Sequence, residues 1–257
     1  MRKTIIAGKW KMYKTITQAI ELANGLKREL FDLDGQDIDM VVCPPFTALT
    51  EVYEVIADSN IRLGAQDVYW ELEGAFTGEV SPSMLKDLGC QFVIIGHSER
   101  RQYFHETNES VNKKLKAALK NNLTPIVCVG ETLSERERGE TFKVLDDHIQ
   151  NGLKDISAED ILKIVIAYEP VWAIGTGKTA TSQQAQEAQK YIRDLLAKMY
   201  NRDISEVVRI QYGGSVKPEN IVDLLSQPDV DGALVGGSSL EVKTFAEIVK
   251  KASGVEK

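Results

Sequence analysis

Short β-rich runs recur along the whole 257-residue chain, and this recurrence is what most constrains how the chain can fold. Eight such runs lie at residues 4–8, 39–43, 61–65, 92–96, 125–129, 164–168, 208–212 and 232–235. Several are almost continuously apolar, which is typical of parallel strands that are covered on both faces. We therefore expect a parallel sheet of eight strands.

The segments between these runs carry apolar residues at helical spacing. Three such faces are formed by residues 49, 52, 53 and 56, by residues 111, 115, 118 and 119, and by residues 185, 188, 192, 195 and 199. Each predicts an amphipathic helix that packs on the sheet. Thr181 and Gln184 predict a capping box at the start of the last helix, because their side chains can satisfy free amides there.

Strand and helix alternate along the chain without a linker or a low-complexity tract. This alternation predicts a (β/α)8 barrel, an α/β fold, with residues 1–257 as a single domain. A doubly wound open sheet is the alternative. It would leave strands at an edge and would place the chemistry at a switch point rather than around a ring.

Charge and composition argue against several classes of protein. The net charge of −7 disfavours a nucleic-acid surface, because phosphate backbones are held by clustered Lys and Arg. Cys43, Cys90 and Cys128 stand alone, with no Cys or His at metal-ligand spacing, so we expect no metal site and a reducing, cytoplasmic setting. Charges interrupt the first apolar run within a few positions, so we expect neither a signal peptide nor a membrane span.

Chemically versatile residues follow the strands. Lys9 and Lys11 come after the first run, His97 after the fourth and Glu169 after the sixth. Because barrel enzymes build their active sites at the carboxyl ends of the strands, we expect these side chains to share one face.

Glu169 ends an apolar run and alternates in phase with Val165 and Ala167. If that side faces the barrel, the carboxylate is shielded from water and can act as a general base. A surface Glu that opens a loop is the alternative.

His97 continues the alternation of Val93 and Ile95 and precedes a short helical turn that includes Glu99. The positive end of a helix dipole disfavours the imidazolium form, so the ring would stay neutral and could polarise a carbonyl with its N–H. A hydrogen-bonded core histidine is the alternative.

Glycines mark the remaining loops. Residues 172–179 are not a nucleotide-binding phosphate loop, because Trp172 stands where the motif requires Gly; residues 170–178 are better suited to a lid that closes over a substrate. Clusters at 213–215 and 236–239 follow the last two strands, where barrels frequently bind phosphate through backbone N–H groups.

Five segments together resemble the triosephosphate isomerase family: residues 8–12 (Gly-Lys-Trp-Lys-Met), 96–101 (Gly-His-Ser-Glu-Arg-Arg), 167–178 (Ala-Tyr-Glu-Pro-Val-Trp-Ala-Ile-Gly-Thr-Gly-Lys), 212–216 (Tyr-Gly-Gly-Ser-Val) and 234–237 (Leu-Val-Gly-Gly). They occur in the family's order and span almost the whole chain. The resemblance implies a TIM barrel that interconverts dihydroxyacetone phosphate and glyceraldehyde 3-phosphate through an enediol(ate), with no cofactor and no metal.

The resemblance also implies a role for each matched residue. Glu169 would be the base, neutral His97 the electrophile, and Lys11 a positive charge for the substrate that Glu99 supports. Residues 170–178 would form the lid. The backbone N–H groups of Gly175, Ser215, Gly236 and Gly237 would bind the phosphate. Residues 66–79 resemble the family's long third loop, which reaches into a neighbouring subunit, so a homodimer is implied.

The sequence departs from the family at Lys9, where the family has Asn, and at Tyr13, where it usually has a second Asn. Lys9 would share the substrate pocket, and strand alternation places it on the same side as Lys11. We expect Lys9 to compete for Glu99 and to perturb Lys11, because a long cation differs from an amide in charge, volume and donor geometry.

Three function classes remain open. They are an active isomerase, a phosphosugar barrel of other chemistry, and the same fold with strongly reduced activity because of Lys9. The second class would be expected to have a Schiff-base lysine at a strand end or a metal-binding carboxylate cluster, and we expect neither.

Overall fold

Eight parallel strands form a closed ring in the computed structural model, which describes residues 2–33, 35–36, 38–174 and 180–255. The strands are β1 (Thr4–Lys9), β2 (Ile38–Cys43), β3 (Ile61–Ala65), β4 (Phe92–Ile95), β5 (Thr124–Val129), β6 (Val165–Tyr168), β7 (Arg209–Tyr212) and β8 (Gly232–Val235). They pair in chain order, and β8 closes the ring on β1 with Ile5 opposite Gly232. The eight predicted strands and the (β/α)8 barrel are confirmed.

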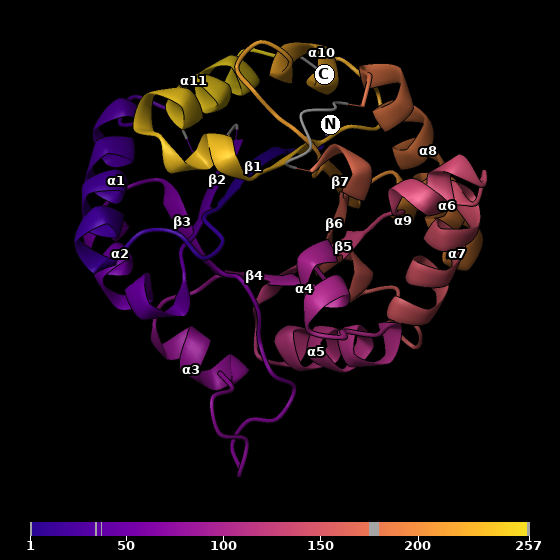
Figure 1. The fold of residues 1–257 in the computed structure, drawn as a ribbon, viewed down its shortest axis with the longest axis horizontal. Coiled ribbons are helices and arrows are strands. Elements are labelled where there is room, and N and C mark those ends of the chain that lie inside the picture. The colour runs from indigo at the N-terminus through magenta and orange to yellow at the C-terminus, as the bar shows by residue number, and fades with distance from the viewer. Residues whose placement is uncertain (1, 34, 37, 175–179, 256–257) are drawn as a thin grey trace.

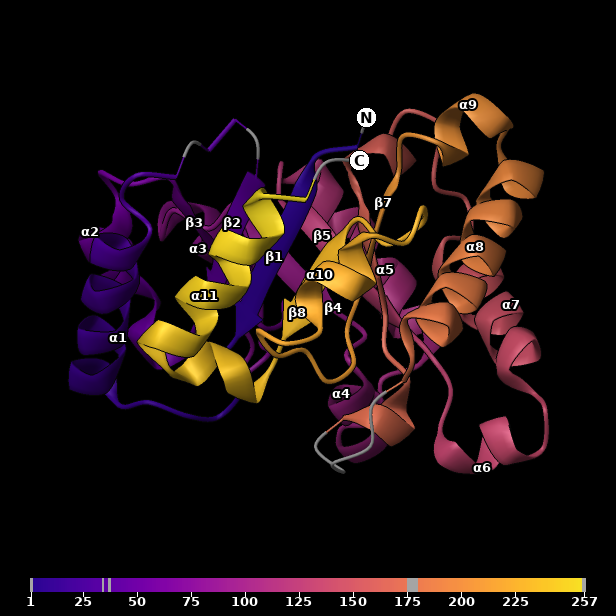
Figure 2. The ribbon, with the colours of Figure 1, turned by 90° about the horizontal axis from the view of Figure 1, so that it is seen from above.

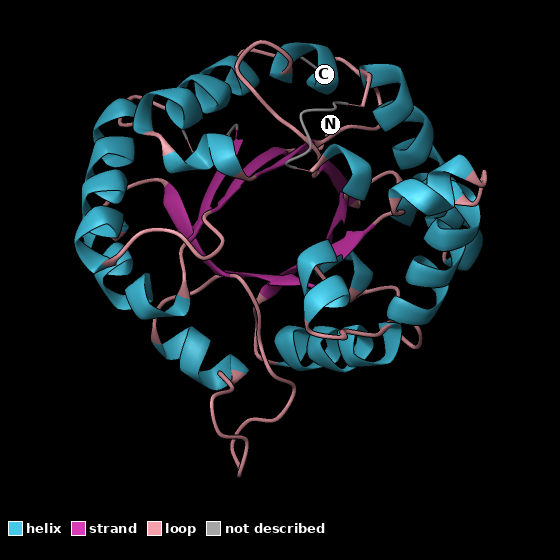
Figure 3. Ribbon diagram, viewed as in Figure 1, coloured by secondary structure: helices cyan, strands magenta, loops and turns pink. Residues whose placement is uncertain are grey.

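The helices surround this ring (Figures 1 and 3). They are α1 (Ile16–Glu29), α2 (Leu49–Ile56), α3 (Pro82–Asp87), α4 (Ser98–Tyr103), α5 (Asn108–Lys120), α6 (Leu133–Glu137), α7 (Thr141–Gly152), α8 (Ser182–Met199), α9 (Arg202–Ser205), α10 (Ile221–Leu225) and α11 (Val242–Ser253), with short 3-10 turns at Phe46–Ala48, Ile161–Lys163, Val171–Ala173 and Gly237–Leu240. The three predicted amphipathic faces lie on α2, α5 and α8. The capping box of α8 is present, with Thr181 as the N-cap.

The strands bury both of their faces. One apolar cluster fills the inside of the ring and consists of Ile5, Ala7, Val41, Cys43, Phe92, Ile94, Ile126, Cys128, Val165, Ala167 and Leu234. A larger cluster lies between the strands and the helices. Two-sided burial explains why several strands read as almost continuous apolar runs.

The two ends of the barrel differ. The described chain begins at the amino ends of the strands, whereas α4 and α6 lie at the carboxyl ends (Figure 2). The connection between β3 and α3 projects away from the ring (Figure 1). In the described part of the chain, no helix combines the length and the apolar character that a membrane crossing requires.

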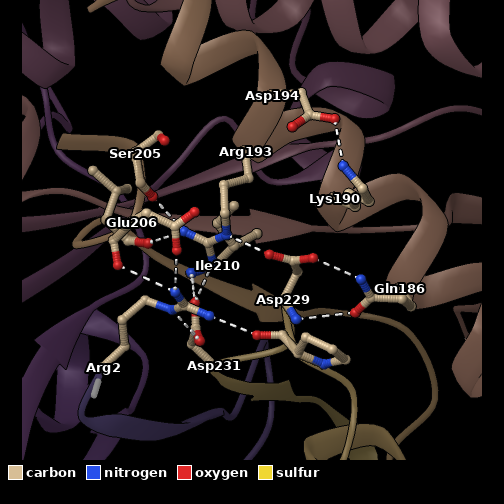
Figure 4. Close-up of polar contacts among 12 residues, drawn as sticks. Arg2, Gln186, Lys190, Arg193, Asp194, Ser205, Glu206, Ile210, Asp229 and Asp231 are labelled. Carbon is tan, nitrogen blue, oxygen red and sulfur yellow. Dashed lines mark hydrogen bonds and ion pairs between the residues drawn. The ribbon is translucent and has the colours of Figure 1, made fainter. Parts of the chain in front are cut away.

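An ionic network closes the amino-terminal end of the barrel around Arg193 of α8 (Figure 4). Its Nη2 donates to Asp231 Oδ2 (2.8 Å), its Nε to Asp229 Oδ1 (2.5 Å), and its Nη1 to the carbonyl oxygens of Ser205 (2.5 Å) and Val208 (2.9 Å). Arg193 is 4% exposed and Asp231 is fully buried. One guanidinium therefore holds together the start of β8, the approach to β7 and helix α8.

We expect Arg193→Met to lower the free energy of unfolding by about 3–5 kcal/mol, because the buried carbonyl oxygens of Ser205 and Val208 lose the guanidinium that donates to them and the buried carboxylates lose a cation. Urea unfolding followed by circular dichroism measures this loss. Lys190→Met is the matched control on the same helix. Lys190 pairs with Asp194 at the exposed surface (2.8 Å) and its replacement should cause no measurable change. Equal midpoints for the two variants would contradict the central place of Arg193.

Candidate active site

Three side chains from different strands meet inside the mouth of the barrel. Lys9 is the last residue of β1, Glu169 directly follows β6, and His97 lies two residues beyond β4. Lys9 Nζ is 2.6 Å from Glu169 Oε1 and 2.6 Å from His97 Nε2, and His97 Nε2 is 2.9 Å from Glu169 Oε1. Their exposed fractions are 3%, 1% and 5% for Lys9, Glu169 and His97. We refer to these three residues as the Lys9–His97–Glu169 cluster.

The position of Glu169 is fixed from both sides. Its backbone N–H donates to Val129 O (2.7 Å) and so extends the ladder between β5 and β6, and its Oε2 accepts the N–H of Ser98 (3.0 Å). A Cβ atom on Gly213 would lie 2.7 Å from Glu169 Cγ, which is closer than packing allows. Glycine at 213 therefore leaves the room that the carboxylate needs.

His97 reaches the cluster by a route that strand alternation did not predict. Phe92 and Ile94 face the inside of the barrel, whereas Val93 and Ile95 belong to the outer cluster under the helices. The prediction that Val93 and Ile95 share the side of His97 is therefore wrong. Gly96 has φ of +73°, a left-handed conformation that turns the chain before His97.

The hydrogen bonds of His97 define its protonation. His97 is the N-cap of α4, and its Nδ1 accepts the backbone N–H of Glu99 (3.2 Å). A nitrogen that accepts carries no proton, so the ring is neutral and its proton is on Nε2. That proton faces the other two members of the cluster.

Opposing effects set the ionisation of Glu169. Complete burial by itself would raise the pKa of the Glu169 carboxyl. The positive charge of Lys9 and the hydrogen bonds from His97 and Lys9 outweigh burial and hold that pKa well below its usual range. The carboxylate is therefore ionised at neutral pH and able to accept a proton.

Lys11 pairs with a different carboxylate from the one that Lys9 contacts. It follows β1 with φ of +52°, and Gln66 Nε2 donates to its carbonyl oxygen (2.9 Å). Its Nζ pairs with Glu99 Oε1 at 2.5 Å. The predicted support of Lys11 by Glu99 is thus present, whereas the prediction that Lys9 competes for Glu99 is wrong, since Lys9 contacts Glu169 and His97 instead.

A buried ionic cluster holds the segment around His97. Glu106 accepts the N–H of Gly96 (3.1 Å) and the Nε of Arg100 (3.0 Å), and it also contacts Lys114. Burial raises the pKa of Asp67, which pairs with Lys114 and Arg100, to about 6 despite these cations. These bonds fix the turn that presents the imidazole.

Two cavities open beside the cluster. One of about 280 Å³ is lined by Lys9, Lys11, His97 and Glu99. The other, of about 300 Å³, is lined by Lys9 and Lys11 together with both predicted phosphate loops, including Ser215, Gly236 and Gly237. Lys9 and Lys11 line both cavities, so they lie between the phosphate loops and His97. Gly175 lies outside the described residues.

The described start of the predicted lid rests on Glu131, a fully buried residue. Glu131 accepts the indole N–H of Trp172 (2.8 Å), the hydroxyl of Tyr168 (3.1 Å) and a guanidinium N–H of Arg136 (3.2 Å). Lid residues 175–178 lie outside the described residues.

Sequence reasoning gave no role to Ser98 or Glu131, and it placed Gly213 only in a phosphate loop. Ser98 acts through its backbone, and the close approach of Gly213 to Glu169 is visible only in the folded structure. Of these, only Glu131 carries a signal of its own, since it is a charged residue two positions after the apolar run of β5. Among the described residues, no group of three or more His, Cys, Asp or Glu side chains could hold a metal ion.

Comparison with known proteins gives a consistent result. A model of the family described as triosephosphate isomerase matches residues 4–252. Proteins named triosephosphate isomerase from Carboxydothermus hydrogenoformans, Thermoanaerobacter pseudethanolicus and Fusobacterium nucleatum are 58%, 55% and 52% identical in sequence to this chain. Each alignment covers 97% of this chain and 99% of the relative. With the closed barrel and the ordered motifs, these matches show that the chain belongs to the triosephosphate isomerase family.

Proposed function

We propose that the protein interconverts dihydroxyacetone phosphate and D-glyceraldehyde 3-phosphate through an enediol(ate). The observation that carries this proposal is the ionised, buried Glu169 carboxylate next to the Nε2 proton of neutral His97. The pair sits beside a cavity lined by glycine-rich loops that suit a phosphate. Family membership supports the same aldose/ketose isomerase activity.

Glu169 is the base in this proposal. It takes a proton from the carbon next to the substrate carbonyl and returns it to the neighbouring carbon, so the proton moves without net gain or loss. The N–H of His97 stabilises the charge that develops on the oxygens. Burial strengthens both effects because it excludes water from the reacting atoms.

The remaining residues bind the substrate. Lys11, held by Glu99, supplies positive charge, and Lys9 lines the same cavities. Backbone N–H groups of Ser215, Gly236, Gly237 and Gly175 would bind the phosphate, and residues 170–178 would close over it.

The position of Lys9 supports a second candidate function, an isomerase of the same fold with strongly reduced activity. Its Nζ contacts both the proposed base and the proposed electrophile at 2.6 Å. A substrate must compete with these contacts, and the lowered pKa of Glu169 makes the carboxylate a weaker base.

A cytoplasmic homodimer through residues 66–79 is also part of the proposal. This loop projects from the barrel (Figure 1), and Leu72 and Phe76 on it are 47% and 40% exposed. Val68 does not contribute to the surface, because it is buried, and Tyr69 stacks on Trp70 with ring centroids 4.1 Å apart. Exposed Phe104 and Met12 add apolar surface that a partner could cover.

We expect Glu169→Gln to lower kcat by about 10²- to 10⁴-fold, the usual contribution of a positioned proton carrier. The amide keeps the shape of the carboxylate but cannot accept the proton. A coupled assay with glyceraldehyde 3-phosphate measures the loss, and circular dichroism checks the fold. Glu247→Gln, on the exposed side of α11, is the matched control and should keep parent activity. Parent activity in Glu169→Gln would refute the assignment.

We expect Lys9→Asn to raise kcat/KM by about 10- to 100-fold. One charge-assisted hydrogen bond to Glu169 is worth about 1.5–3 kcal/mol, and each 1.36 kcal/mol is about tenfold in rate. Removing it should also raise the pKa of Glu169. Because the base works only when ionised, activity is lost as pH falls through that pKa, and the acidic limb of the kcat/KM profile should move to higher pH. An unchanged rate and profile would reject the reduced-activity candidate.

We expect Phe76→Asp to shift the protein from dimer to monomer, because a charge at the centre of an apolar contact must be desolvated. Light scattering coupled to size exclusion measures the mass in solution. Phe31→Asp is the control, since Phe31 is 79% exposed and lies outside the loop. A parent protein that is monomeric, or a dimer that survives Phe76→Asp, would refute the role of this loop.

A further inference from the structure

A third cavity, of about 570 Å³, opens outside the proposed active site. It lies between helix α4, the segment that follows β5, helix α7 and the turn at Val171–Ala173, and we call it the α4–α7 cavity. None of its described lining residues is shared with the two cavities beside the Lys9–His97–Glu169 cluster. Small-molecule sites in proteins usually measure about 300–1,000 Å³, so this cavity is large enough to hold a ligand of its own.

Arg101 brings an unpaired positive charge to the α4–α7 cavity. Its Nε donates to Gly96 O (3.0 Å) and its Nη1 to Asn108 Oδ1 (2.8 Å). Its Nη2 is buried without a hydrogen-bond partner, and within the described ranges no carboxylate forms an ion pair with it. Burial lowers the pKa of this guanidinium, which remains charged at neutral pH. Because buried charges in proteins are normally paired, an anion in the cavity would supply the charge that Arg101 lacks.

His148 of α7 adds a hydrogen-bond donor to the same cavity. Its Nδ1 accepts the backbone N–H of Gly130 (3.3 Å). Burial and the charge of Arg101 lower the pKa of His148 to about 3, so the ring is neutral and carries its proton on Nε2. In the part of the chain that is described, Nε2 has no partner, and unlike Arg101 Nη2 it is accessible to solvent. An acceptor oxygen of a ligand can therefore bind to it.

The cavity also has an apolar wall, to which Leu133, Val171 and Trp172 contribute. Glu135 is a carboxylate that lines the cavity, and its Oε2 is already engaged by the backbone N–H (2.7 Å) and the hydroxyl (2.8 Å) of Thr132. One cation, one free donor and an apolar wall are complementary to a ligand that has an acidic head and an apolar body.

We propose that the α4–α7 cavity binds a small monocarboxylate that carries an aromatic or branched apolar body. Its carboxylate accepts the Nε2 proton of His148 and lies beside the guanidinium of Arg101, while its body packs on the apolar wall. Hydrogen bonds to an ionised group are roughly twice as strong as neutral ones, so the charge of the head dominates recognition.

The cavity adjoins the proposed active site without being part of it. Ser98 lines the cavity, and the backbone N–H of Ser98 donates to Glu169 Oε2 (3.0 Å). A ligand here therefore contacts a residue that holds the proposed base and leaves the phosphate loops free. The inference goes beyond the proposed isomerisation and does not require it, because binding is measured without turnover.

Isothermal titration calorimetry of the full chain with sodium benzoate tests this inference. Benzamide has the shape of benzoate without its charge, and acetate has the charge without the ring, so each should bind at least about tenfold more weakly. Saturating inorganic phosphate should not displace benzoate, because phosphate binds at the glycine-rich loops. The indole N–H resonance of Trp172, assigned by its loss in Trp172→Phe, should shift on addition of benzoate, whereas those of Trp10 and Trp70 should not.

Three variants, each checked by circular dichroism, locate the site. Leu133 is 41% exposed, so Leu133→Glu should fold normally, and the like charge that it adds to the wall should weaken benzoate binding at least about tenfold. His148→Phe keeps a ring but removes the donor, and it should weaken binding as well. Leu162→Glu is the matched control, since Leu162 is 46% exposed and does not line the cavity, and it should bind benzoate as the parent does.

Four results would overturn the inference. They are no binding of benzoate to the parent, equal affinity for benzoate and benzamide, displacement of benzoate by phosphate, and parent-like binding in Leu133→Glu. A resonance of Trp172 that stays unmoved while benzoate binds would also overturn it, because the ligand would then lie elsewhere.

Discussion

Closure of the sheet is the constraint on which the rest of the molecule depends. Each strand pairs on both sides, and because helical connections return the chain between consecutive strands, all eight run parallel and end on one face. Residues far apart in the chain, Lys9 and Glu169 above all, are brought into contact because their strands terminate at the same mouth. The inward side chains below them exclude water, and this burial strengthens every electrostatic interaction in the cluster.

Burying a charge costs free energy, and the Lys9–His97–Glu169 cluster is stable only because its members form hydrogen bonds and an ion pair with one another. Glu169 receives hydrogen bonds from Lys9 at Oε1 and from the Ser98 backbone at Oε2, with His97 Nε2 also facing Oε1. Removing one partner would leave the others unpaired in a low-dielectric site. The network around Arg193 obeys the same rule at the opposite end of the barrel, where it holds strands and a helix together rather than presenting reactive groups.

The sequence predicts much of the fold because strand and helix patterns are regular, and it fails where the backbone leaves them. The eight strands follow from apolar runs, and residues such as Glu169 are correctly placed by alternation with Val165 and Ala167. Alternation fails at Gly96, whose positive φ turns the chain before His97. Lys9 and Lys11 do line the same cavities, as expected, but Lys9 pairs with Glu169 and Lys11 with Glu99. Alternation tells which side a residue faces, and it does not tell which carboxylate lies nearest.

The exchange of asparagine for lysine at position 9 is best understood through hydrogen-bond stoichiometry. An amide has both a donor and an acceptor, so it can face an imidazole N–H and a carboxylate at the same time. An ammonium group can face only the carboxylate. Lys9 Nζ nevertheless lies 2.6 Å from both His97 Nε2 and Glu169 Oε1. The exchange thus replaces a residue that could pair with both groups by a cation whose ion pair with Glu169 lowers the pKa of the proposed base.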